Sequence, residues 1–104
     1  MGLTTDPNDP GLKKIRPDGQ QENYIVLSEA ERAKGFVRPV RLGYVHLKCG
    51  GLTTMPRAIA ETYARDPGYN GATFCVRCGA HFPLIDENGK RAFLWDGEKA
   101  GVGE

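Results

Sequence analysis

The placement of cysteine and histidine is the feature that most limits how this chain can fold. All three cysteines and both histidines fall in two short segments, His46–Gly51 and Cys75–His81. The first carries the pattern H-x2-C and the second C-x2-C, and a gap of helix length separates them. Two side chains separated by two residues can grip one ion from a tight turn, and a following glycine lets the backbone turn back toward the sulfurs. This spacing is typical of a structural zinc site.

Thiolate and neutral imidazole are the ligands that select zinc, and four of them complete its shell. Three of the ligands are expected to be Cys49, Cys75 and Cys78. For the fourth we favour His46, because its pair with Cys49 mirrors the pair of Cys75 and Cys78. His81 is the alternative fourth ligand, or it could donate a hydrogen bond to a ligand or lie at a strand edge. We therefore expect one structural Zn²⁺ ion.

Other interpretations of the cysteines are a disulfide with one thiol left over, or three unconnected buried thiols. The odd cysteine count, the lack of a signal-peptide core in residues 1–20 and the glycine after each pair argue against both. A site closed by four protein ligands is structural, because hydrolytic zinc needs an open position for water. No general base stands out nearby, so we expect no catalytic residues and no enzymatic activity.

Length and composition set further bounds on the fold. The chain has 104 residues, 39% of them hydrophobic, with 14 glycines and 7 prolines, so it forms one small domain with a thin core and many turns. A metal cross-link suits such a domain, because zinc binding of about 10–16 kcal/mol in model peptides exceeds or matches its whole stability. No apolar run approaches the ~20 residues needed to cross a bilayer, so we expect no membrane contact.

Local signals predict a three-part organisation. Residues 1–23 hold three prolines and few large apolar side chains, so they should form an extended or disordered arm. Residues 24–97 form the zinc-ribbon domain, and residues 98–104 a flexible tail. Because an arm that cannot fold alone needs support, we expect it to lie against other protein subunits of an assembly.

Within the domain, Ser28 and Glu31 form a capping box for a short helix over about residues 29–34. A strand over 41–47 delivers the first metal-binding pair. Thr53 or Thr54 then caps an amphipathic helix, whose apolar stripe is Met55, Ala58, Ile59, Thr62 and Tyr63. The helix packs across the zinc site.

Two further strands flank the second metal-binding pair, over 72–75 and 81–85. Asn88-Gly89 predicts a hairpin that returns antiparallel over 91–95, with Phe93 and Trp95 on one face. The expected fold class is a small α+β zinc ribbon with antiparallel β-hairpins and one packed amphipathic helix, preceded by the extended N-terminal arm.

Several stretches resemble a group of small zinc-ribbon-like proteins encoded by tailed bacteriophages and prophages. The matching stretches are Arg16–Gln20, Asn23-Tyr24, Leu27–Arg41, Ala60–Pro67 and Gly71–Cys75, and the likeness extends over about positions 16–97. The group has counterparts of Cys75, Cys78, His81 and Cys49-Gly50. Many members carry a long insertion between the positions of His46 and Cys49 that this chain lacks. The resemblance implies a viral source and a late or accessory role, and it carries no activity with it.

These observations favour a non-enzymatic zinc protein that makes protein–protein contacts, as an accessory capsid or tail component of a phage virion. Synthesis would take place in the host cytoplasm. The alternative is a nucleic-acid-binding or transcription-modulating module, in which Arg38 and Arg41 would contact phosphate. The net charge of +1 does not favour it, because dedicated duplex binders are strongly basic. A metal-dependent hydrolase would require an open coordination position.

Overall fold

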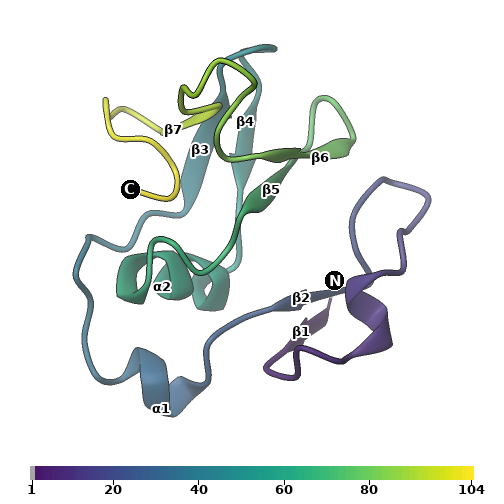
Figure 1. Ribbon diagram of the computed structural model, residues 1–104, viewed down its shortest axis with the longest axis vertical. Coiled ribbons are helices and arrows are strands. Elements are labelled where there is room, and N and C mark those ends of the chain that lie inside the picture. The colour runs from purple at the N-terminus through teal and green to yellow at the C-terminus, as the bar shows by residue number, and fades with distance from the viewer. Residues whose placement is uncertain (1) are drawn as a thin grey trace.

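The computed structural model describes residues 2–104, and its centre is a three-stranded antiparallel sheet in the order β4-β3-β7 (Figure 1). The strands are β3 (Gly43–His46), β4 (Leu52–Thr54) and β7 (Phe93–Trp95). Tyr44 lies opposite both Thr53 and Trp95 in the register, and His46 lies opposite Phe93. Residues alternate across the strand, so Tyr44 and His46 both point to the buried face.

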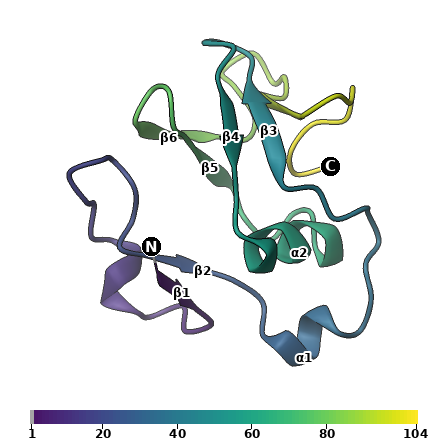
Figure 2. The same ribbon diagram turned by 180° about the vertical axis from the view of Figure 1, so that it is seen from behind.

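A second antiparallel pair, β5 (Ala72–Cys75) and β6 (Ala80–Pro83), forms a hairpin beside this sheet (Figure 2). The expected hairpin around Asn88-Gly89 forms over residues 84–92. Ile85 and Arg91 form an antiparallel bridge, and the Ala92 and Asp86 amides donate to the carbonyls of Leu84 and Lys90 at 2.9 Å and 2.7 Å. After Ala92 the chain leaves this hairpin, and β7 pairs with β3, which the sequence did not indicate. Pairing with β3 places Phe93 and Trp95 together in the core, where both are buried.

The main helix, α2 (Arg57–Arg65), packs its apolar side against the sheet as expected, but it begins later than predicted. Thr53 and Thr54 belong to β4 and do not cap the helix. Pro56 precedes it in an extended conformation, and proline before the first turn sacrifices no helical hydrogen bond. The buried face is formed by Ala60, Thr62, Tyr63 and Ala64. Of the predicted stripe, Ala58 and Ile59 are only partly buried.

A single helical turn, α1 (Glu29–Arg32), is capped as the sequence predicts. The Ser28 hydroxyl accepts a hydrogen bond from the Glu31 amide at 3.2 Å. One turn is too short to be stable alone. An ion pair of 2.6 Å between Arg32 and Glu61 of α2 connects it to the main helix, and both side chains are largely shielded from solvent.

The core is built on aromatic side chains and closed by the C-terminal residues. Tyr44 meets the rings of Phe93 and Trp95 edge to face, and Tyr63 of α2 meets Trp95 in the same way. Residues 98–104, expected to be a flexible tail, return to this core. Val102 is fully buried, and its amide donates a hydrogen bond to the carbonyl of Phe93 at 3.0 Å.

The first 23 residues also differ from the expected extended arm. They contain β1 (Gly2–Thr4) and the 3-10 turn η1 (Pro10–Leu12), and β1 pairs in parallel with β2 (Asn23–Ile25). We call residues 2–25 the N-terminal unit. Short polar side chains close its turns, as where Asp9 accepts a hydrogen bond from the Gly11 amide at 2.8 Å. Hydrogen bonds within its turns thus stabilise this segment, which lacks a row of apolar side chains.

The N-terminal unit lies against the β5–β6 hairpin at two points. A Cβ on Gly19 would lie 1.9 Å from the carbonyl oxygen of Gly79, so only glycine allows this approach, and its φ of 91° also requires glycine. The Tyr24 hydroxyl lies 2.9 Å from Nε2 of His81. No helix among residues 2–104 is long and apolar enough to cross a membrane.

Candidate metal centre

Four side chains from two hairpins converge on one point of the structure. His46 ends β3 and Cys49 follows it, while Cys75 ends β5 and Cys78 follows that strand. One ligand atom from each lies within 4.8 Å of the other three. Residues 26 or more positions apart are thereby brought together. These four side chains could hold a metal ion, and they are the four ligands that the sequence favours.

The distances between these atoms match the edges of a small tetrahedron. The sulfurs of Cys49 and Cys75 are 3.4 Å apart, and the sulfur of Cys78 lies 3.6 Å from Nδ1 of His46. Zinc bonds of about 2.3 Å to sulfur and about 2.0 Å to nitrogen predict tetrahedral edges of about 3.8 Å and about 3.6 Å respectively. The donor atoms and these two distances are therefore compatible with a four-coordinate ion, and all four donors lie within 4.8 Å of one another.

The two ligand pairs lie in turns of the same design. In the first, the Gly50 amide donates to the carbonyl of His46 at 2.7 Å, and in the second the Gly79 amide donates to the carbonyl of Cys75 at 2.8 Å. Both glycines have positive φ, 73° and 66°. This is the turn geometry that the glycine after each pair predicts.

Backbone amides also point at the sulfurs. The Gly51 amide lies 3.3 Å from the sulfur of Cys49, and the Cys78 amide lies 3.4 Å from the sulfur of Cys75. Such hydrogen bonds favour the thiolate, which is the form that binds metal. The two turns touch each other as well, because a Cβ on Gly51 would lie 2.6 Å from the Cβ of Arg77.

His46 is fixed by two phenylalanine rings. Its imidazole stacks on Phe93 at 4.7 Å between centroids and lies 4.6 Å from Phe82 at a tilt of 33°. The side chain is 3% exposed. Burial, with a smaller contribution from the charge of Lys48, lowers the pKa of His46. The ring therefore stays neutral, which is the form that coordinates metal.

The three thiols lie close enough together to affect the pKa of Cys49 and that of Cys78. For Cys49, desolvation opposes ionisation, but the Gly51 amide, the neighbouring thiols and the charge of Arg77 together lower its pKa. Desolvation and the other two thiols raise the pKa of Cys78 to about 11. Three adjacent thiolates cannot form without a compensating charge. A divalent cation supplies that charge and would deprotonate the coordinating thiols.

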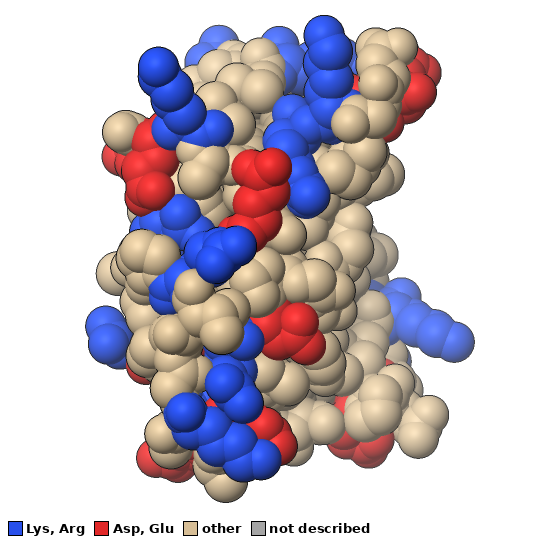
Figure 3. All heavy atoms as spheres, turned by 60° about the vertical axis from the view of Figure 1, so that its left-hand side comes forward, with Lys and Arg blue, Asp and Glu red and all other residues tan. Residues whose placement is uncertain are grey.

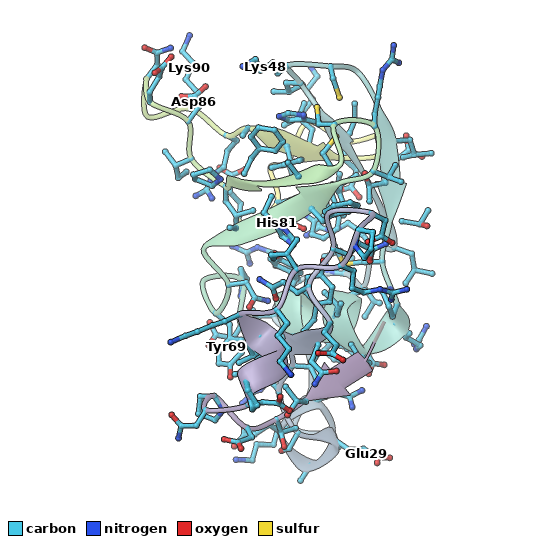
Figure 4. The ribbon with its side chains drawn as sticks, turned by 90° about the vertical axis from the view of Figure 1, so that its right-hand side faces the viewer. Glu29, Lys48, Tyr69, His81, Asp86 and Lys90 are labelled. Carbon is cyan, nitrogen blue, oxygen red and sulfur yellow. The ribbon has the colours of Figure 1, made fainter. Side chains whose placement is uncertain are left out.

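His81, the alternative fourth ligand, lies outside this cluster. Its Nε2 faces the hydroxyl of Tyr24, and its ring lies 5.2 Å from that of Phe74. Figure 4 shows it on the side of the β5–β6 hairpin that faces the N-terminal unit. Strand alternation explains the difference, because His81 lies opposite Phe74 in the register, whereas Cys75 is one residue further on.

The two arginines of the alternative nucleic-acid interpretation have different surroundings. The Arg41 guanidinium lies 4.6 Å above the ring of Trp95 and 2.9 Å from Glu98, and the side chain is 12% exposed. Arg38 is exposed and donates to its neighbour's carbonyl. Lys and Arg side chains run along the face in Figure 3, with Asp and Glu side chains between them. The Arg41 guanidinium is thus already paired with Trp95 and Glu98 inside the fold.

Three residues that position the two histidines were not identified from the sequence. Phe82 and Phe93 hold the His46 ring, and Tyr24 holds His81. The alternation of residues 91–95 could have suggested Phe93, because it places that side chain on the buried face. Nothing in the sequence indicates Tyr24, which lies 57 positions from its partner.

Comparisons with protein-family models, with curated proteins and with solved structures gave no match. The interpretation of the centre as a metal site therefore rests on the types and positions of its four side chains. Four protein ligands in a closed set can hold an ion rigidly and cross-link the two hairpins.

Proposed function

We propose that this chain is a structural zinc protein of the zinc-ribbon type, without catalytic activity, which works by contacting other protein subunits. The observation that carries the proposal is the cluster of three sulfurs and one imidazole nitrogen within 4.8 Å of one another. Sulfur and imidazole donors select zinc over harder cations such as magnesium and calcium. In a fold of short strands, the ion would join the two hairpins and so complete the core.

The contact with partners is proposed for the N-terminal unit. Its sheet has two strands of three residues each, which is too little to be stable by itself. Among the described residues β1 pairs only with β2, so its other edge offers free amides and carbonyls. Leu3 on β1 is 42% exposed, and Ile15, which bridges Gln21 within the same unit, is 61% exposed. A partner strand added to β1 would satisfy this edge, and a partner covering the unit would bury these side chains.

The resemblance to small phage and prophage proteins extends the proposal to the kind of assembly. The partner would be a capsid or tail subunit, and the chain an accessory component of the virion. Zinc would keep the domain rigid enough to hold its shape within such an assembly.

The zinc proposal is tested by a matched pair of histidine variants. Elemental analysis of the purified protein should give one zinc per chain. His46→Asn should lower zinc affinity strongly, while His81→Asn should leave the stoichiometry unchanged. Cobalt substitution should give the absorption of a four-coordinate thiolate site without exchangeable water. A site with bound water, or equal zinc loss in both variants, would contradict the proposal.

The partner proposal is tested by cross-linking with a lysine-reactive reagent in cells that produce the protein naturally. Lys13 and Lys14 belong to the N-terminal unit, whereas Lys48 and Lys90 lie together at the opposite end of the molecule (Figure 4). Links to another protein should come from the first pair and be lost in a variant with Leu3→Asp and Ile15→Asp. The control is Leu52→Asp, which changes an equally exposed leucine on β4. Links only from Lys48 and Lys90 would contradict the assignment.

A further inference from the structure

A cleft lies between the N-terminal unit and the rest of the fold, and none of the four possible metal ligands lines it. Its volume is about 280 Å³, which suits a ligand of one or two rings. One wall comes from the N-terminal unit, and the other from β4, the start of α2 and the strand β5. Residues from each part that line it include Gln21, Tyr24, Thr54, Ile59, Asn70 and Thr73.

The lining of this cleft carries no formal charge, although the chain has 14 basic and 13 acidic side chains. His81 is the one imidazole in the lining. Burial lowers the pKa of His81, so its ring is neutral near pH 7. A charged ligand would lose its hydration here without gaining an opposite charge. The lining therefore selects for uncharged molecules.

Aromatic faces and carboxamides together line the walls. Tyr24 and Phe74 flank His81, with ring centroids 5.7 Å and 5.2 Å from the imidazole. The hydroxyls of Tyr44 and Thr73 already bond to each other at 3.0 Å. Gln21 and Asn70 add primary amides, each with two donors and one acceptor oxygen. A lining that combines aromatic rings with carboxamides matches a planar ligand that carries both donors and acceptors.

We propose that this cleft binds an uncharged, planar heteroaromatic molecule with an amide-like hydrogen-bonding edge. The inference does not depend on the proposed protein partner. A molecule bound here would touch both walls, so it would also hold the N-terminal unit against the domain.

The experiment uses nicotinamide and nicotinate as probes on the zinc-loaded full chain. The two have the same ring and nearly the same shape, but nicotinate carries a negative charge at pH 7. Adenosine and uridine serve as larger uncharged probes. Binding is read from amide chemical shifts in two-dimensional NMR, where residues of the cleft such as Gln21, Asn70 and Thr73 should shift and saturate.

Two glycine variants give a matched steric test. Gly71 lines the cleft and Gly68 does not, yet both lie in the loop before β5 and both have open space where a Cβ would be placed. Gly71→Leu should abolish saturable binding, whereas Gly68→Leu should leave it intact. Thr54→Trp is a second variant that fills the cleft from an exposed strand position. Zinc content and melting temperature, measured on each variant, verify the fold.

The expected result is saturable shifts confined to the cleft with at least one uncharged probe, and at least tenfold weaker binding of nicotinate than of nicotinamide. Three results would overturn the inference: no saturable shifts with any uncharged probe, equal binding of the charged and uncharged pair, or binding that Gly71→Leu and Thr54→Trp leave unchanged in folded protein. A failure of the zinc stoichiometry in folded protein would leave these outcomes readable, because none of the four possible metal ligands lines the cleft.

Discussion

The hydroxyl of Tyr24 lies 2.9 Å from Nε2 of His81 and connects the N-terminal unit to the strand that leaves the metal centre. This pairing separates the roles of the two histidines. His46 belongs to the cluster of possible metal ligands, while His81 joins two parts of the fold. Each role has its own experimental consequence.

Removing the Tyr24 hydroxyl should weaken the fold without affecting metal content. Tyr24→Phe leaves a partly buried imidazole without its partner, so we expect the free energy of unfolding to fall by about 1 kcal/mol. The measurement is urea unfolding of the zinc-loaded protein. Tyr69→Phe, at a more exposed tyrosine, is the matched control and should change little. Zinc loss in Tyr24→Phe would show that His81 serves the metal instead.

The stability should depend on pH through His81. Burial lowers the pKa of His81 from its ordinary value of 6.5, so the unfolded chain binds a proton more readily than the folded chain. The neutral ring therefore makes its full contribution to the free energy of unfolding above pH 6.5, the pKa in the unfolded chain. This contribution is lost as the pH falls from 6.5 toward the lower pKa of the folded chain. The stability difference between the wild type and His81→Gln should therefore narrow as the pH falls through this range. A difference that stays constant with pH would contradict this origin.

Val102 should prove essential to the core, despite its place in the segment expected to be flexible. The side chain is fully buried, so Val102→Ala should cost roughly 1–3 kcal/mol in the free energy of unfolding. Val37 is 56% exposed, so Val37→Ala should change stability by no more than about 0.5 kcal/mol. Thermal and chemical unfolding of both variants check the contrast, and equal effects would argue against the docking of the C-terminal residues.

Arg41 should act in stability rather than in binding. Its guanidinium covers Trp95 and pairs with Glu98, so Arg41→Ala should cost about 1–2 kcal/mol. Arg38→Ala should be nearly neutral, because that side chain is exposed. Titration with duplex DNA and with RNA at low salt provides the second readout. An affinity that both substitutions weaken would favour the nucleic-acid alternative.

The sequence predicted the parts of this fold that depend on local chemistry. The paired turns of the metal centre follow from residue types and spacing within a few positions, and so does the Ser28 cap. The hairpin turn at Asn88-Gly89 was predicted as well. The pairing of β7 with β3 was not, because it depends on packing of Phe93 and Trp95 against a distant part of the chain. The docking of Val102 and of Tyr24 was missed for the same reason. Such contacts join positions whose separation leaves no local pattern.

The close approach of Gly19 to the backbone of Gly79 has a consequence beyond shape. Gly79 completes the turn that presents Cys78, so the surface that Gly19 contacts belongs to the same loop as one of the possible metal ligands. If a bound ion stabilises this loop, removal of the ion would also weaken the contact at Gly19. A partner bound to the N-terminal unit would then respond to metal removal without touching the metal.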